Sequence, residues 1–438
     1  MVTSAGVVRL GLGLVASLVI ARALGPADFG VYAVLAATVG IVGSLAEGGL
    51  TEAAVLRISA VRPHSPGGQA MQRARAFWWL RVGLAGSVVG VGCVLAGPIS
   101  TYLLHVDEGL LRWALLGIVA TAASGGVSAM LQATGAFGRM SSLTLLNTGL
   151  TAVLALGLAL VGRLDLLAAL LVLGIGTSLA TFGLGRSLLP KGWQLGPPAL
   201  RELQKEAQLL FRTGRWLWLA SLFAMLTANA EILLLNRWAG LPLVGSYALA
   251  LNLATKADVV NTSLYTVLLP GVAVLDERAK VAAYVRRGLV RSGVIALGLA
   301  ALIPVAQPLI VLAYGAEFTQ AAVFFRLLVL VAIFDVLLTP FLLLPLAFRQ
   351  PRVLAAADAV RALTLVVVAL GLIPLYGAVG AIAARFVARL AGAALVLATL
   401  YLRKPLEVQH EKTAGLADQW PVASAHIEPL EGADQPSR

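Results

Sequence analysis

The sequence predicts an all-α polytopic membrane protein with about twelve transmembrane helices in two six-helix lobes. The 438-residue chain is 59% hydrophobic and only 12% charged, about half the charged fraction of an average soluble protein. Apolar runs of about 20 residues recur along its length, and each is long enough to cross a hydrocarbon core of about 30 Å. The longest internal hydrophilic connection, 190–206, divides these runs six and six.

The first two spans are expected at 2–22 and 29–47, joined by the stretch ARALGPADFGVYA at 21–33. Gly25 favours the left-handed conformation that ends a helix, and Pro26 fits the first turn of the next helix. A cation at Arg22 complements the exposed carbonyls of the first helix, and Asp28 lies near the positive N-terminus of the second. This stretch therefore predicts a tight hairpin between two transmembrane helices.

The remaining spans follow in the same way. They are expected at 77–104, 110–134, 140–162, 165–189, 211–237, 242–270, 289–314, 322–346, 352–373 and 376–402. The predicted domains are an N-terminal six-helix lobe at 1–190, a cytoplasmic inter-lobe linker at 191–210 and a C-terminal six-helix lobe at 211–403. Residues 404–438 are rich in Pro, Glu, Asp and Gln without an apolar period, which predicts a disordered cytoplasmic tail.

Basic residues are distributed unevenly between the two sides of the membrane. The connection after the second span carries Arg57, Arg62, Arg73, Arg75 and Arg81, and other connections on that side are also basic. The opposite side carries only Arg22, Arg112, Arg163, Arg237 and Arg326. Because cytoplasmic loops retain Lys and Arg, both termini are expected in the cytoplasm. The net charge of +12 is thus a topology signal, and no nucleic-acid partner is expected.

The two halves contain an internal repeat. The segment PADFGVYA at 26–33 has a counterpart in PLVGSYA at 242–248, and matching Tyr32 with Tyr247 gives an offset of 215 residues. An even number of spans leaves both halves in the same orientation. The repeat therefore predicts lobes related by a pseudo-two-fold axis along the membrane normal.

The sequence does not favour enzyme chemistry. Its histidines lie in expected loops or the tail and lack metal-site spacing, and no phosphate-binding P-loop is present. Cys93 is the only cysteine, which excludes a disulfide framework within the chain. No cofactor or metal is expected. Any energy source is then an ion gradient, the membrane potential or the substrate gradient.

The stretch at 21–33 resembles the first hairpin of polysaccharide-transport proteins, the O-antigen and exopolysaccharide repeat-unit flippases of the multidrug/oligosaccharidyl-lipid/polysaccharide (MOP) superfamily. The segments LYTVLLPG at 264–271 and PLIVLAYGAEF at 308–318 add to this resemblance, which covers residues 1–403. It implies a MOP/MATE-like fold in the bacterial cytoplasmic membrane. Family members often have a longer basic segment before the first span, whereas here only residues 1–8 precede Arg9. This difference affects the expected depth of Arg9 in the membrane.

The resemblance also implies a function. Such proteins move polyprenyl-diphosphate-linked oligosaccharides from the inner to the outer leaflet by alternating access, for surface polysaccharide biosynthesis. Polysaccharide polymerase and glycosyltransferases are the implied partners. Two alternatives are an ion-coupled multidrug exporter of small cationic compounds and a membrane-embedded polymerase or glycosyltransferase. The excess of buried cations disfavours the exporter, and the short connection at 190–206 leaves no room for a catalytic domain.

Ionisable residues within spans are the candidate functional residues, because each costs a few kcal/mol unless it faces a cavity or a partner. Guanidinium and ammonium groups bind a diphosphate through charge-assisted hydrogen bonds. The candidate substrate-binding cations are Arg9, Lys256, Arg385 and Arg389. By the resemblance, spans one, two, seven and eight line the cavity, which brings Arg9 and Lys256 toward one space.

Each cation also has a structural alternative. Lys256 pairing with Asp258 or Glu231 is one, and Arg385 and Arg389 pairing with Asp335 or Asp358 is another. Asn147, Asn229 and Asn252 are candidate polar partners for sugar hydroxyls, with Trp216 and Trp218 as stacking surfaces. Glu231 and Asp335 are candidates for binding a coupling ion, either a proton or sodium.

Overall fold

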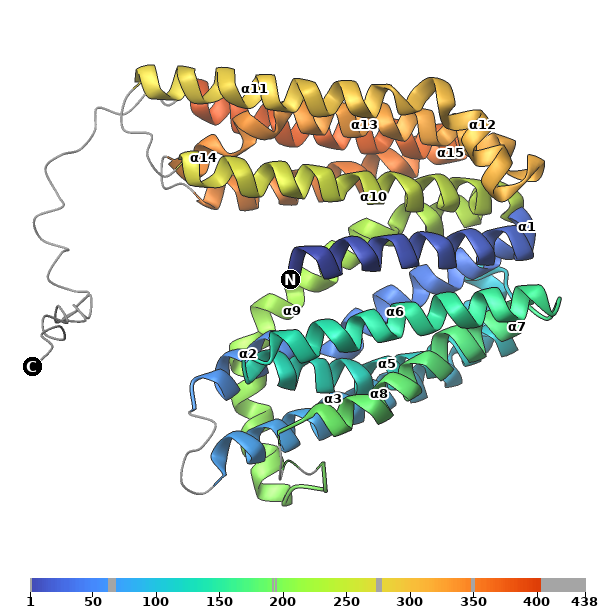
Figure 1. Cartoon of the computed structure of the whole chain (residues 1–438), viewed down its shortest axis with the longest axis vertical. Coiled ribbons are helices and arrows are strands. Elements are labelled where there is room, and N and C mark those ends of the chain that lie inside the picture. Colours follow the sequence, from blue (N-terminus) through green and yellow to red (C-terminus); the bar gives the residue numbers. More distant parts are fainter. Residues whose placement is uncertain are drawn as a thin grey trace, which may run out of the picture.

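The computed structural model describes residues 2–61, 68–190, 193, 195–272, 278–347 and 351–402. This part of the chain is helical apart from short connections and contains no β-strand (Figure 1). The all-α prediction is confirmed. The expected tail at 404–438 lies outside the described residues.

The helices form two lobes. The first contains α1 (Val2–Glu47), α2 (Leu50–Ser59), α3 (Gln69–Val94), α4 (Ala96–Pro98), the π-helix η1 (Ile99–Leu104), α5 (Glu108–Ala133), α6 (Phe137–Leu160), α7 (Leu166–Ala168), the π-helix η2 (Ala169–Gly176) and α8 (Thr177–Leu188). The second contains α10 (Leu241–Val272), α11 (Arg278–Ala300), α12 (Leu302–Tyr314), the 3-10 helix η3 (Ala316–Phe318), α13 (Thr319–Leu342), α14 (Leu344–Ala347) and α15 (Pro351–Leu402). Helix α9 (Leu200–Trp238) runs diagonally from one lobe to the other (Figure 1).

The number of membrane crossings agrees with the prediction. Nine helical segments of the described residues are long and apolar enough to span a membrane. Two of them, Val8–Glu47 and Arg352–Leu400, turn back at Gly25 and Gly377, where φ is +69° and +56°. Glycine adopts these backbone angles without a Cβ penalty, and each segment therefore crosses twice. Helix α10 packs between α1 and α13 and adds a crossing, so the described residues contain all twelve predicted spans.

The repeated motif lies where the two lobes meet. The 215-residue offset that matches the tyrosines also matches Gly30 with Gly245. A Cβ at Gly30 would lie 2.2 Å from the Leu241 carbonyl oxygen, and one at Gly245 would lie 2.0 Å from the Pro26 carbonyl oxygen. Backbone therefore packs on backbone at equivalent positions of the repeat. This contact supports the predicted pseudo-two-fold relation between the lobes.

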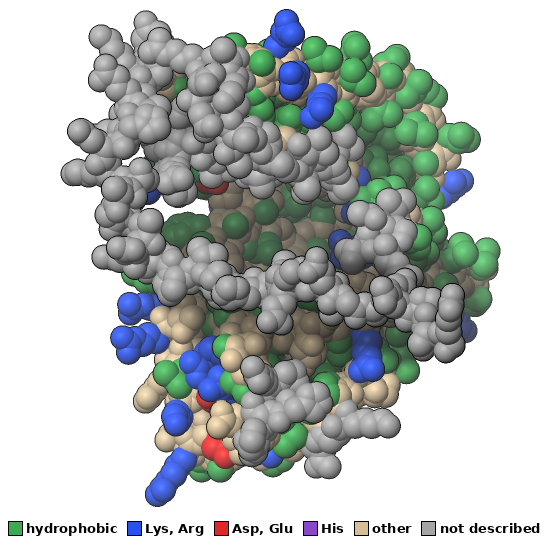
Figure 2. All heavy atoms as spheres, turned by 60° about the vertical axis from the view of Figure 1, so that its left-hand side comes forward, with side chains coloured by type: hydrophobic (Ala, Val, Ile, Leu, Met, Phe, Trp, Pro, Cys, Tyr) green, Lys and Arg blue, Asp and Glu red, His purple; other side chains and the backbone are tan. Residues whose placement is uncertain are grey.

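The molecule is closed at one end and hollowed at the other. We call the end that contains Gly25, Gly315 and Gly377 the hairpin end, and the opposite end, with Arg57 and Arg352, the basic end. The lobes converge at the hairpin end and separate toward the basic end (Figure 1). The space-filling view from that side shows a hollow between them (Figure 2). We call this hollow the inter-lobe cleft.

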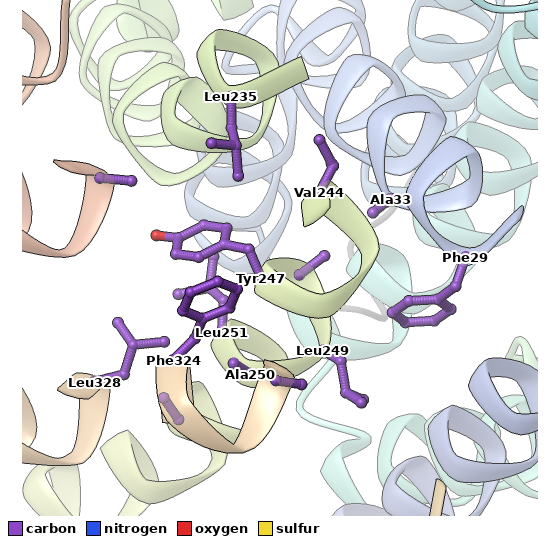
Figure 3. Close-up of a cluster of buried hydrophobic side chains, with 14 of the residues drawn as sticks. Phe29, Ala33, Leu235, Val244, Tyr247, Leu249, Ala250, Leu251, Phe324 and Leu328 are labelled. Atoms are coloured by element: carbon purple, nitrogen blue, oxygen red, sulfur yellow. The ribbon is translucent and has the colours of Figure 1, made fainter. Parts of the chain in front are cut away.

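Apolar packing and one interlobe hydrogen bond seal the hairpin end. The rings of Phe29 and Phe318 lie 6.2 Å apart edge to face, and Arg22 donates from Nη1 to the Ala313 carbonyl oxygen at 3.2 Å. A continuous buried cluster around Tyr247 joins residues of α1, α9, α10 and α13 (Figure 3). The inter-lobe cleft is therefore blind at this end.

Helix α9 connects the two lobes. Near the basic end, Gly214 packs on Gly49 so closely that a Cβ at either would lie 2.4 Å from the other's carbonyl oxygen. Glu206 accepts from Arg57, with Nη2 and Oε2 3.2 Å apart. Near the hairpin end, Leu235 is buried in the cluster of Figure 3. Because α9 begins at Leu200, helical structure starts within the predicted inter-lobe linker.

Candidate functional site

The two helices that flank the inter-lobe cleft carry two of the predicted cations. The N-terminal half of α1 packs along α10, and Ser17 Oγ lies 3.4 Å from Asn252 Oδ1 between them. Arg9 lies on the basic-end side of this contact, about 12 Å along α1 from Ser17 at 1.5 Å per residue. Lys256 lies on the same side of it, about 6 Å along α10 from Asn252. Counted along the helices from this contact, the two cations therefore differ in depth by about 6 Å.

Neither cation is neutralised by a described carboxylate. Arg9 is exposed and Lys256 is half-buried, and neither forms an ion pair within the part of the chain whose side chains are described. Pairing of Lys256 with Glu231 does not occur, and the side chain of Asp258 lies outside the described residues. Asn252, one helical turn from Lys256 on the same face, adds an amide beside the ammonium group.

Arg385 takes the structural alternative, with a partner that the sequence did not indicate. Its Nη2 lies 2.6 Å from Glu231 Oε2, and its Nε lies 3.1 Å from Oε1. The hydroxyl of Tyr247 also donates to Glu231, whose side chain is fully buried. This group joins α9, α10 and α15. It lies within the second lobe, near the hairpin end.

Arg389 pairs with Asp335, one of the two partners that the sequence suggested for it. Its Nε lies 3.1 Å from Asp335 Oδ2, beside a pocket of about 270 Å³ between α13 and α15. Arg361 and Asp358 line the same pocket and pair at 3.2 Å. The candidate ion-coupling carboxylates Glu231 and Asp335 are therefore both held by arginines. A coupling ion would have to displace a guanidinium at either position.

The candidate asparagines are dispersed. Asn252 lies at the α1–α10 contact described above, whereas Asn229 donates to the Met225 carbonyl oxygen at 2.9 Å within α9. Asn147 is half-buried on α6. Of the two candidate aromatic surfaces, Trp216 is 70% exposed, and the indole nitrogen of Trp218 donates to the Ser44 carbonyl oxygen at 3.2 Å.

The structure adds a cavity that the sequence did not indicate. It has a volume of about 580 Å³ and lies between α1, α3, α5 and α9. Arg81 Nη1 lies 2.9 Å from Glu47 Oε1, and its Nε donates to the Ala122 carbonyl oxygen at 3.0 Å. The sequence interpretation counted Arg81 with the loop cations, but it lies within α3. Gly125 and Gly126 on α5 were the available signal, because they leave room for this side chain.

Comparison with known proteins adds the family. A family model described as "Polysaccharide biosynthesis protein" matches residues 19–323, well over half of the chain. The chain belongs to this family. The resemblance drawn from residues 21–33 is thereby confirmed. No curated protein sequence matches the chain.

Solved structures with the same fold are transporters and flippases. The lipid II flippase MurJ in an inward closed conformation has a TM-score of 0.70 at 12% identity, covering 91% of this chain and 87% of that one. An inward-facing multidrug resistance MATE family transporter of the MOP superfamily has a TM-score of 0.61 at 17% identity, covering 90% and 94%. At these identities the likeness shows the fold. The chain is a multi-pass membrane protein with the MOP fold.

A third solved structure also has this fold. It is a MOP superfamily transporter from Pyrococcus furiosus, with a TM-score of 0.52 at 16% identity, covering 90% of this chain and 92% of that one. Its description states that the reverse polarity of its binding pocket suggests a different function.

Proposed function

We propose that this protein is a flippase that moves polyprenyl-diphosphate-linked oligosaccharides from the inner to the outer leaflet of the bacterial cytoplasmic membrane. The family match supports a role in polysaccharide biosynthesis. The observation that carries the proposal is the placement of Arg9 and Lys256 on adjacent helices, both on the basic-end side of the Ser17–Asn252 contact, beside a cleft that is closed at the hairpin end. Two cations without a described carboxylate partner suit a compact anion such as a diphosphate.

The charge asymmetry orients the protein in this proposal. The basic end carries Arg57, Arg73 and Arg75 on α2 and α3, and basic ends of membrane proteins face the cytoplasm. The inter-lobe cleft then opens to the cytoplasmic side, where the substrate enters. Release to the other leaflet requires the hairpin end to open and the basic end to close. The polyprenyl chain stays in the bilayer beside the cleft.

Deletion of the gene tests the proposal in the host. Loss of one surface polysaccharide is expected, together with accumulation of its lipid-linked repeat unit. Expression of the wild-type gene should restore the polymer, and Lys256→Met should not. Lys256→Arg, which keeps the charge, is the matched control and should restore it. Full rescue by neutral substitutions at both Arg9 and Lys256, at normal expression, would overturn the anion-binding mechanism.

Drug susceptibility separates the flippase from the multidrug exporter. An exporter of small cations needs a pocket with negative or neutral potential, whereas the α1–α10 border of the cleft carries two cations. The deletion strain is therefore expected to keep wild-type resistance to cationic compounds. Increased susceptibility with an unchanged surface polymer would favour the exporter. A reporter fused near Ser65 or Leu195 that reads as external would reverse the proposed orientation.

A further inference from the structure

The cavity between α1, α3, α5 and α9 has the size of a ligand site. Its volume of about 580 Å³ lies within the range of about 300–1,000 Å³ that is usual for small-molecule pockets. Its polar lining is Ser44, Glu47, Arg81, Thr121 and Ser221, and the rest of the lining is apolar or glycine. A few polar groups set in an apolar wall orient a ligand and select for it.

The charges of this cavity cancel. Arg81 and Glu47 form an ion pair at 2.9 Å, and the other polar lining residues are neutral. Because this pair has no net charge, it gives neither a diphosphate nor a simple cation a net electrostatic attraction. The cavity nevertheless offers strong donors and acceptors, and this combination suits a neutral ligand rich in hydroxyl groups.

Glu47 keeps one carboxylate oxygen for such a ligand. Among the described residues, Arg81 and Thr51 both bond to Oε1, Arg81 at 2.9 Å and Thr51 at 2.6 Å. The side chain is 33% exposed at the cavity wall. Its Oε2 can therefore accept a charge-assisted hydrogen bond from a hydroxyl, which is about twice as strong as a neutral one.

Ser44 supplies independent evidence. It lines the cavity and is 7% exposed, yet its hydroxyl has no hydrogen-bond partner among the described residues. Buried side-chain polar atoms are nearly always hydrogen-bonded, so an orphaned hydroxyl at a cavity wall indicates a missing partner. A ligand hydroxyl would satisfy it.

The guanidinium is fixed before any ligand binds. A Cβ at Gly125 would lie 3.0 Å from Arg81 Nη2, so a larger residue there would crowd the side chain. The Ala122 carbonyl oxygen accepts from Arg81 Nε at 3.0 Å. A group that is already held in place loses little conformational freedom when a ligand binds.

We propose that this cavity binds the neutral, hydroxyl-rich sugar portion of the substrate, while Arg9 and Lys256 bind its diphosphate. The inference rests on the proposed flippase function. Val39 and Glu47 mark the ends of the cavity along α1, about 21 and 33 Å from Gly25 at 1.5 Å per residue. The cavity therefore begins near the depth of the two cations and extends toward the basic end.

Binding of two lipids to the purified full-length protein tests this assignment. One probe is undecaprenyl diphosphate, and the other is the same lipid carrying a neutral hexose disaccharide. The wild type should bind the glycosylated lipid more tightly. Ser44→Ala should weaken that binding about tenfold, the equivalent of about 1.4 kcal/mol, and should leave binding of the bare lipid unchanged.

Ser292→Ala is the matched control, because Ser292 on α11 is also fully buried and its hydroxyl also lacks a partner among the described residues. Neither variant removes an internal hydrogen bond, so both should melt no lower than the wild type, and Ser292→Ala should bind both lipids normally. Equal wild-type affinities for the two lipids, or equal effects of the two serine variants, would overturn the proposed sugar site but not the proposed flippase function. Failure of the wild type to bind either lipid would overturn the proposed function as well.

Discussion

Replacing Gly245 by alanine tests whether the hairpin end opens during transport. The new Cβ would lie 2.0 Å from the Pro26 carbonyl oxygen and 2.9 Å from the Gly30 nitrogen, whereas Cβ contacts under 3.0 Å essentially do not occur. Both obstructing atoms belong to the backbone and cannot rotate away. The first turns of α10 and the second half of α1 must therefore separate by about 1 Å, a distance read from the difference between these contacts.

The energetic cost follows from overpacking at a tight interface, which is typically about 1–3 kcal/mol. The contact closes the hairpin end and would be broken when that end opens, so the cost falls on the closed state alone. At about 1.4 kcal/mol per factor of ten, the ratio of hairpin-open to hairpin-closed protein should rise about 5- to 150-fold.

Cysteine labelling measures this change. In a Cys93→Ala background, Val244→Cys places a thiol at a fully buried position of the interface. An impermeant maleimide added to the outside of intact cells should label it faster when Gly245→Ala is also present. Gly293→Ala is the control, because a Cβ there would meet nothing within 4 Å.

An unchanged labelling rate in the Gly245→Ala protein would refute the reasoning. So would an equal acceleration by the Gly293→Ala control, since that substitution does not touch the interface. Faster labelling together with slower transport is the expected pair of results, because a transporter biased toward one state cannot complete its cycle efficiently.

Three further predictions concern the charged residues. Lys256→Met should lower transport at least tenfold in reconstituted vesicles, the loss expected for about 1.5–3 kcal/mol from one hydrogen bond to a charged group, whereas Lys256→Arg should retain most of the rate. Arg385→Ala should destabilise the protein by about 3–5 kcal/mol, measured as a lower melting temperature in detergent, because it leaves the buried carboxylate of Glu231 unbalanced. Arg361→Ala should cost no more than about 1 kcal/mol in the same assay, since its partner Asp358 is 74% exposed.

The spans and the first hairpin were predictable because they depend on local sequence. Twenty apolar residues must cross the bilayer as a helix, and only glycine tolerates the backbone angles seen at Gly25. The start of α9 was harder. Its first turns contain Arg201, Glu202, Lys205 and Glu206, a composition typical of a loop. In the structure these turns are helical, and Glu202 and Glu206 form ion pairs with Arg75 and Arg57 of the first lobe.

The partner of Arg385 could not be predicted, because it depends on how distant helices pack. Arg385 and Glu231 are 154 residues apart, and no local spacing relates them. Asp358 and Arg361, in contrast, are three residues apart on one helix, where neighbouring side chains meet, so local spacing alone accounts for their pairing. Arg81 was misassigned for a different reason: position 81 already lies inside the expected span at 77–104, yet it was counted with the basic connection before that span. In the structure it lies well within α3, which begins at Gln69.

Neutralising Lys256 and neutralising Arg385 should shift the melting temperature in opposite directions, because only Arg385 has a buried carboxylate partner. Arg385 stabilises the fold because it balances Glu231, so its removal leaves a buried charge. Lys256 is half-buried and has no described carboxylate partner, so its desolvation destabilises the substrate-free protein until an anion binds. Lys256→Met should therefore raise the melting temperature of the substrate-free protein while it lowers transport, the usual exchange between stability and function at a binding site. A lower melting temperature for Lys256→Met would instead assign this lysine to the structural class of Arg385.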